Sequence, residues 1–241
     1  MHTIAIVLSY ALLPVLTMAI GSGAALLRTP PPAVRSGIQH FAAGVIFAVV
    51  AVELLPAMRL IHNDVPEVIG GFAAGILLML VVERLTRSHE HARPGERPGS
   101  ARMLIPIGVD LFLDGMLLAI AFAAGPSEGR LLALALACEL LALGLALTVE
   151  LRELQRSRSA SIGVPVALAF GALMGGAGLG ASLFRSLPPQ AMAALLAFGT
   201  AALIFLVIEE LLVEAHVVGE TQAGTAMFFA GFLVLLVLGL E

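Results

Sequence analysis

The sequence predicts an all-α integral membrane protein with eight transmembrane helices. Hydrophobic residues make up 59% of the 241 positions and charged residues only 12%, whereas a soluble domain carries about 25% charged residues. The mean hydropathy is +1.02. Apolar runs of membrane-spanning length recur along the whole chain, and short segments rich in proline, glycine and charge separate them.

The first half of the chain contains four such runs, each near the 20 or so apolar residues that cross a hydrocarbon core. Ile4–Leu27 ends at the loop RTPPPAVRSG, and Ile38–Met58 ends at IHNDVPE. Val65–Leu85 opens with a proline and a glutamate, which makes its start the least regular. A polar loop containing histidines, residues 86–102, then leads to Met103–Ala124.

The second half repeats this organisation with four further runs. We expect spans at Leu131–Val149, Ile162–Leu183, Gln190–Val213 and Gln222–Leu240, with RSLPPQ as the turn between the sixth and seventh. The connections leave no room for a separate soluble domain. Residues 1–241 are therefore expected to form one transmembrane domain.

The distribution of arginine predicts the orientation of these spans. The chain has no lysine, and all 13 basic residues are arginine. Numbering the loops from the N-terminus, the odd-numbered loops together with the adjoining end of the third span (Arg84) hold ten arginines, and the even-numbered loops hold three. Because basic residues in short loops favour the cytoplasm, we expect both termini outside the cell membrane and the loop 86–102 inside.

Two stretches of the sequence resemble each other. FAAGVIFAVVAVELL begins at Phe41 and FGTAALIFLVIEELL at Phe198, and each phenylalanine lies twelve residues before a glutamate, Glu53 or Glu210. The next span opens with FAAG in one copy and FFAG in the other. The first three and last three spans are thus predicted to form an inverted repeat in a 3+2+3 arrangement, as in many secondary transporters. Chance similarity between two alanine-rich helices is the alternative.

Three carboxylates lie in the middle of two predicted spans. Asp110 and Asp114 share one face of the fourth span, because residues four apart lie one above the other on a helix. Glu139 lies at the centre of the fifth. Three ionised carboxylates at this depth would cost roughly 8–10 kcal/mol if uncompensated, and carboxylate clusters suit hard divalent cations. They are therefore predicted to form a metal site, with protonated packing groups as the alternative.

Further acids and a histidine lie nearer the two mouths of the predicted bundle. Glu53 is expected near the outer end of the second span, and Glu209 and Glu210 toward the inner end of the seventh. We expect these three to line an ion pathway. His40, at the inner start of the second span, is either a ligand on the exit route or an interfacial residue.

The loop between the third and fourth spans contains SHEHARPGERPG. His89 and His91 flank a glutamate there and could bind a transition metal weakly, although a solvated polar loop is the simpler interpretation. The net charge of −4 gives no nucleic-acid footprint. The single cysteine, Cys138, excludes a disulfide framework and a cysteine-based zinc site.

Taken together, these features resemble the ZIP (zinc/iron-regulated transporter-like) family of divalent metal transporters. The shared features are eight spans, outside termini, a histidine-containing loop after the third span and the 3+2+3 plan. HFAAGVIFAVVAVELLPAM resembles the second helix of that family, and LIFLVIEELLVEAH resembles its seventh. The resemblance covers nearly the full length of the chain.

The resemblance also implies a set of ligands, which here departs from the family pattern. The fourth helix of the family usually reads HNxPEG, and the matching segment here is DLFLDG. Asp110 takes the place of the histidine and Asp114 that of the glutamate, while Glu139 matches one ligand on the fifth helix. Leu140 and Leu143 stand where further ligands of a second site would be. One metal site is retained on this alignment.

The leading hypothesis is a transporter that moves divalent metal ions toward the cytoplasm. An oxygen-only site suits manganese or ferrous iron beside zinc. The alternatives are a degenerate homologue that senses or scaffolds without transport, and a membrane metalloenzyme. The enzyme is disfavoured because no HExxH motif occurs. Metal ions and the lipid bilayer are the expected partners, and a homodimer is left open.

Overall fold

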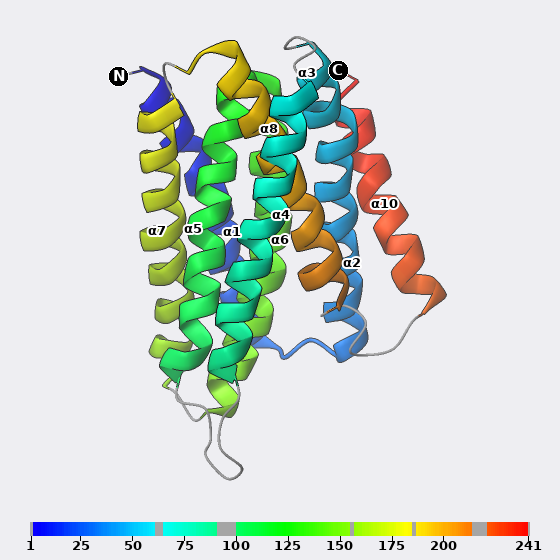
Figure 1. The fold of residues 1–241 in the computed structure, drawn as a ribbon. Coiled ribbons are helices and arrows are strands. Elements are labelled where there is room, and N and C mark those ends of the chain that lie inside the picture. The colour runs from blue at the N-terminus through cyan, green and yellow to red at the C-terminus, as the bar shows by residue number, and fades with distance from the viewer. Residues whose placement is uncertain are drawn as a thin grey trace.

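The computed structural model describes residues 2–60, 65–90, 100–154, 157–184, 187–213 and 221–240. Every regular element in these ranges is a helix (Figure 1). The elements are α1 His2–Leu27, α2 Pro32–Val49, η1 Val50–Leu54, α3 Leu55–Leu60, α4 Val65–Glu90, α5 Ser100–Ala124, α6 Pro126–Glu153, α7 Arg158–Leu183, α8 Pro189–Phe205, η3 Leu206–Leu211 and α10 Gln222–Leu238.

The prediction of a membrane-embedded helical protein is supported by seven described helical stretches long and apolar enough to cross a bilayer. They correspond to the first seven predicted spans. α10 is also apolar but has 17 residues, so it is about 25 Å long, less than a hydrocarbon core of about 30 Å. The predicted eighth span thus forms a helix, but a shorter one than the other spans.

Several helices continue beyond the predicted apolar runs. α2 begins at Pro32, α4 continues to Glu90, and α6 extends from Pro126 to Glu153. The 28 residues of α6 make a helix about 42 Å long, so its polar ends extend past the hydrocarbon core. Apolar runs mark only the lipid-embedded part of a helix, which explains why the predicted bounds were too short.

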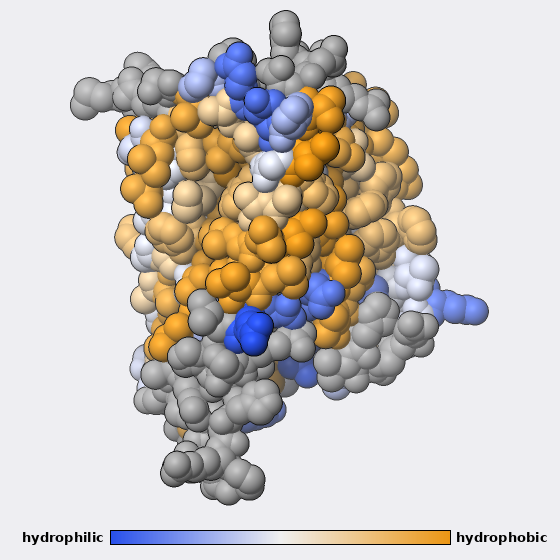
Figure 2. All heavy atoms as spheres, in the orientation of Figure 1, coloured by the Kyte–Doolittle hydropathy of each residue, from blue (hydrophilic) through white to orange (hydrophobic). Residues whose placement is uncertain are grey.

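The outer surface of the bundle carries large apolar side chains over its middle. Leu77 on α4, Phe229 and Leu233 on α10, and Phe170 on α7 are each more than half exposed. Figure 2 shows an apolar band on the face in view, with hydrophilic side chains toward the two ends. Soluble monomers rarely expose contiguous apolar patches of this size, so lipid is the natural solvent for this surface.

Glycine residues bring α1 against α6 and α5 against α7. A Cβ built at Gly21 would run into the Leu141 carbonyl, and one at Gly144 would run into the carbonyl of Met18. α5 and α7 meet in the same way, with Gly115 against the backbone of α7 and Gly176 against that of α5. Small residues let membrane helices approach this closely, and α1, α5, α6 and α7 form one group, the α5–α6 bundle.

The remaining long helices form a second group, the α2–α8 bundle, consisting of α2, α4, α8 and α10. Here Gly75 of FAAG lies against Phe198 on α8, and Gly231 of FFAG lies against Phe41 on α2. α2 also contacts η3, and α8 contacts η1. The two bundles meet mainly where α2 packs on α6 and where α5 packs on α8.

The start of α1 and the end of α10 lie at the same end of the molecule (Figure 1), which we call the terminal end. α6 is the most enclosed of the membrane-length helices. It carries Glu139 at its midpoint, so the centre of the fold is also where the predicted metal ligands lie.

Candidate metal centre

The structure brings together the three carboxylates that the sequence predicted as metal ligands. Asp110 and Asp114 lie on α5 and Glu139 lies on α6, and each offers an oxygen atom within 4.8 Å of those of the other two. Among the described residues, this is the one group of three or more acidic, histidine or cysteine side chains close enough to hold a metal ion.

These carboxylates are deep inside the bundle. Asp114 is 0% exposed and Glu139 is 4% exposed, while Asp110, one helical turn before Asp114, is only partly buried. Asp114 and Glu139 both lie near the midpoints of their helices. The cluster therefore lies near the middle of the bundle, and Asp110 is its most accessible member.

Helix packing explains why these side chains converge. Gly115 turns one face of α5 toward α7, at Leu173. Each residue rotates by about 100° around the helix, so Asp110 and Asp114 lie on the side facing away from α7. On α6, Gly144 faces α1 in the same manner. Because the glycine faces of α5 and α6 pack against α7 and α1, the acidic faces of α5 and α6 are free to pack against each other.

The chemistry of the site follows from its donors. Carboxylate oxygens are the ligands that hard divalent cations prefer, and zinc accepts them as well. The chain has no lysine, and no arginine occurs within residues 103–124 or 131–149. Without a basic side chain in these segments, protonation, water or a bound cation are the ways in which negative charge could be compensated there.

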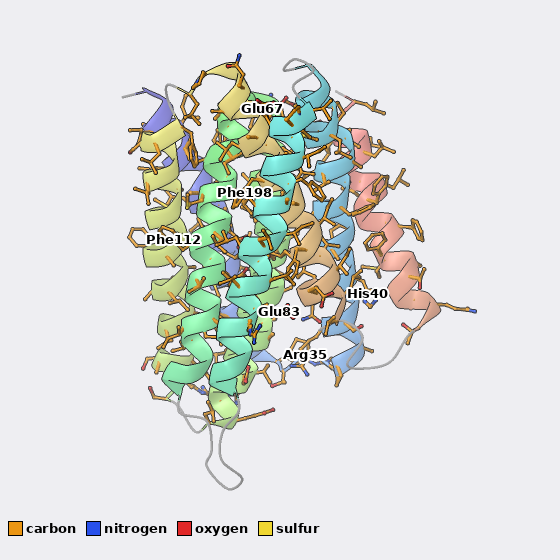
Figure 3. All side chains as sticks on the ribbon, in the orientation of Figure 1. Arg35, His40, Glu67, Glu83, Phe112 and Phe198 are labelled. Atoms are coloured by element: carbon orange, nitrogen blue, oxygen red, sulfur yellow. The ribbon has the colours of Figure 1, made fainter. Side chains whose placement is uncertain are left out.

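His40 lies apart from the carboxylates, near the start of α2. It is 4% exposed, and its Nδ1 lies 2.8 Å from the carbonyl oxygen of Ser36. Its ring packs beside Gly224 in the first turn of α10, and Figure 3 labels His40 on α2. The structure makes His40 a buried residue between α2 and α10, which its position in the sequence did not predict.

The acids predicted to line the pathway occur in two π-helical segments. Glu53 lies in η1 and is partly buried, with its Oε1 atom against Gly239 at the end of α10. Glu209 lies in η3 and is exposed. Glu210 belongs to the same segment, but its side chain is outside the described part of the structure. π-Helical turns are rare and frequently mark functional sites.

The predicted weak loop site falls mostly outside the described residues. His91 is not among them, and His89 lies in the last turn of α4, where the backbone alone is described. The two histidines thus stay a prediction.

Sequence reasoning missed Thr200 on α8. It is 0% exposed, and its Oγ1 has no hydrogen-bond partner among the described residues. The internal repeat held a signal, because Thr200 aligns with Ala43 when the two phenylalanines are matched. A hydroxyl that breaks an otherwise apolar repeat position could have been singled out.

No protein-family model matches this chain, and no curated protein sequence matches it significantly. The function must therefore be inferred from the site and its setting.

Proposed function

We propose that this chain is a divalent metal transporter of the ZIP kind, moving zinc, manganese or ferrous ions across the cell membrane toward the cytoplasm. The observation that carries the proposal is the meeting of Asp110, Asp114 and Glu139, with oxygen atoms within 4.8 Å of one another at mid-helix depth. A membrane protein that held no ion would have little use for three acids at its centre, since each is costly there.

The division into two bundles supports transport rather than static binding. All three carboxylates belong to the α5–α6 bundle, whose helix pairs are tied by glycine contacts. The contact with α8 is different in kind, because a Cβ at Gly199 would lie 3.3 Å from the side chain of Leu117. Flexible side chains can slide past one another more readily than interlocked backbones. We propose that the α5–α6 bundle moves with its ion against the α2–α8 bundle.

An inverted 3+2+3 repeat, with α10 as the eighth span, agrees with the helix contacts. In this repeat α1 corresponds to α7, α2 to α8 and α4 to α10, while α5 corresponds to α6. The contact between α2 and α10 then corresponds to that between α8 and α4, and the contact between α1 and α6 corresponds to that between α7 and α5. The glycines of FAAG and FFAG meet the equivalent phenylalanines of the other copy. The two π-helical segments, η1 and η3, also fall at matching places in the repeat. The start of α1 and the end of α10 lie at the same end of the molecule, which agrees with an even number of spans.

The same relation supports a site at the junction of the two halves. Asp110 lies five residues before Gly115, and Glu139 lies five residues before Gly144. Because those glycines make equivalent contacts, the two acids are equivalent ligands from the two central spans. Transporters built from inverted repeats hold their substrate at such a midplane interface.

The orientation follows from the arginine distribution. The terminal end is then outside, with Glu53 in its vicinity, and Glu209 and Glu210 lie toward the cytoplasm. Acids on both sides of the central site would concentrate cations at each mouth.

Uptake into proteoliposomes tests the proposal. Purified protein is reconstituted into vesicles containing a metal-sensitive dye, and the influx of zinc, manganese and ferrous ions is compared with that into protein-free vesicles. Asp114→Asn should abolish influx, whereas Leu111→Ala, a change at a fully buried neighbour on the same helix, should retain it. Binding of the ion without influx would assign a sensing or scaffolding role, and absence of both would refute a metal function.

A further inference from the structure

Thr200 on α8, in the α2–α8 bundle, carries a buried hydroxyl that is not among the proposed carboxylate ligands. Thr200 is 0% exposed, and its Oγ1 has no hydrogen-bond partner among the described residues. The equally buried Thr148 on α6 differs, because its Oγ1 donates to the carbonyl oxygen of Ser161 at 3.1 Å. Leaving a buried hydroxyl unpaired is unfavourable, so Thr200 indicates a polar group that the described part of the chain does not supply.

The neighbours of Thr200 show which way its side chain points. Phe198 and Ala201 lie against Gly75 of α4, and Gly199 faces Leu117 of α5. Thr200 is rotated a further 100° or so from Gly199, away from α4. The side chain therefore lies on the side of α8 away from α4, next to the face that contacts α5.

The level of Thr200 relative to the carboxylates follows from the same contacts. A Cβ at Gly199 would lie 3.3 Å from Leu117 Cδ2 and 3.6 Å from Ile120 Cγ2. Leu117 shares a face of α5 with Asp114, because residues three apart are neighbours on a helix. The level of Thr200 is therefore displaced from that of Asp114 by about one helical turn, roughly 5 Å along the helix axis, toward the terminal end.

The rest of this face of α8 is apolar. Leu196 and Leu203 flank Thr200 one turn away on either side and are 0% and 1% exposed. The hydroxyl is thus an isolated polar group beside the centre of the bundle. An ion approaching the carboxylates from the terminal end would pass this level.

We propose that the Thr200 hydroxyl is a neutral oxygen contact for the hydrated cation on the terminal-end approach to Asp114. This inference rests on the proposed transport function. The hydroxyl can accept from or donate to the water shell of the ion. It stabilises the water shell of the ion without adding charge, so the ion is held only weakly at this point. Because Thr200 is fully buried in this arrangement and α8 belongs to the other bundle, the contact forms only when movement of the two bundles opens the route beside it.

The test compares Thr200→Val, which removes the hydroxyl but keeps the shape, with Thr200→Ser, which keeps the hydroxyl. Thr148→Val is the matched control, because its hydroxyl is equally buried but hydrogen-bonded within the protein. For each variant, ion-free thermal stability is measured in detergent, and the KM for metal influx is measured in proteoliposomes.

We expect Thr200→Val to raise KM by about 2- to 12-fold, the effect of one lost neutral hydrogen bond, without lowering ion-free stability. Thr200→Ser should keep the wild-type KM. Thr148→Val should lower stability and leave KM unchanged.

An unchanged KM in Thr200→Val would overturn the contact, and so would a loss of ion-free stability matching that of Thr148→Val, which would mean a structural hydrogen bond. Failure of the wild-type protein to take up any ion would instead refute the proposed function, and the Thr200 contact with it. Wild-type influx with an unaffected Thr200→Val variant refutes the contact alone.

Discussion

Replacing Asp114 by asparagine should make the ion-free protein more stable while removing its response to metal. The side chain is 0% exposed, and its carboxylate has two acidic neighbours within 4.8 Å. Asparagine keeps the shape and removes the charge. If the carboxylates are present to bind an ion, their proximity is unfavourable whenever the ion is absent.

The structure sets the size of this effect. Two unit charges 4.8 Å apart repel by about 3.5 kcal/mol at an effective dielectric constant near 20. Proton uptake relieves part of this repulsion, and insertion scales assign about 2.5–3.5 kcal/mol to one charge at the bilayer centre. We therefore expect a gain of about 1–3 kcal/mol, which corresponds to a rise in Tm of about 2–12 °C for a chain of this size.

Thermal unfolding in detergent, with and without metal, measures both parts of the prediction. Metal at 100 times its Kd should stabilise the wild type by about 2.7 kcal/mol, and this response should vanish in Asp114→Asn. Glu67→Gln is the control, because it removes the same charge from the first turn of α4 (Figure 3) and should change neither quantity.

Two outcomes would refute the reasoning. Loss of ion-free stability in Asp114→Asn, together with a wild type that does not respond to metal, would show that the acids are protonated packing groups. A metal response that survives the substitution would place the ion elsewhere.

Three further predictions concern the helix packing and the topology. Gly144→Ala should destabilise the protein by about 1–3 kcal/mol, since its Cβ would collide with the backbone of α1. Gly171→Ala should be neutral or stabilising, because nothing lies within 4 Å of that Cβ; equal melting temperatures for the two variants would contradict the contact. Leu111→Ala should cost about 2–5 kcal/mol of stability but leave metal affinity unchanged, as calorimetry can verify. A cysteine replacing Gly95 in a Cys138→Ala background should react with an impermeant reagent only from the cytoplasmic side, and labelling of intact cells would reverse the proposed orientation.

The carboxylate cluster was predictable because it depends on simple geometry. Asp110 and Asp114 share a face through helical periodicity alone. Glu139 lies at a matching depth on the next helix, and consecutive helices joined by a short connection usually lie side by side. Spacing and depth were therefore sufficient to bring these three residues together.

Other features depended on tertiary contacts that no local pattern records. The π-helical segment around Glu53 reads in the sequence as an ordinary apolar stretch, because one extra residue per turn leaves no mark in composition. His40 is buried because Gly224 on a distant helix leaves room for its ring. That the Thr200 hydroxyl is buried without a hydrogen-bond partner among the described residues can likewise be recognised only when the surrounding helices are in place. Helix ends were underestimated because the polar residues beyond the lipid still form helix.

The charges of the site bear on how an ion could cross the membrane in it. Three carboxylates carry at most three negative charges, and one divalent cation leaves one of them uncompensated. A single retained proton would make the loaded site neutral, which is the state that a low-dielectric interior tolerates best. The repeat relation places Leu143 opposite Asp114, each one residue before the glycine of a tight helix contact. An acid at position 143 would add a fourth negative charge that needs further neutralisation. The leucine found there therefore fits a site for one ion rather than two.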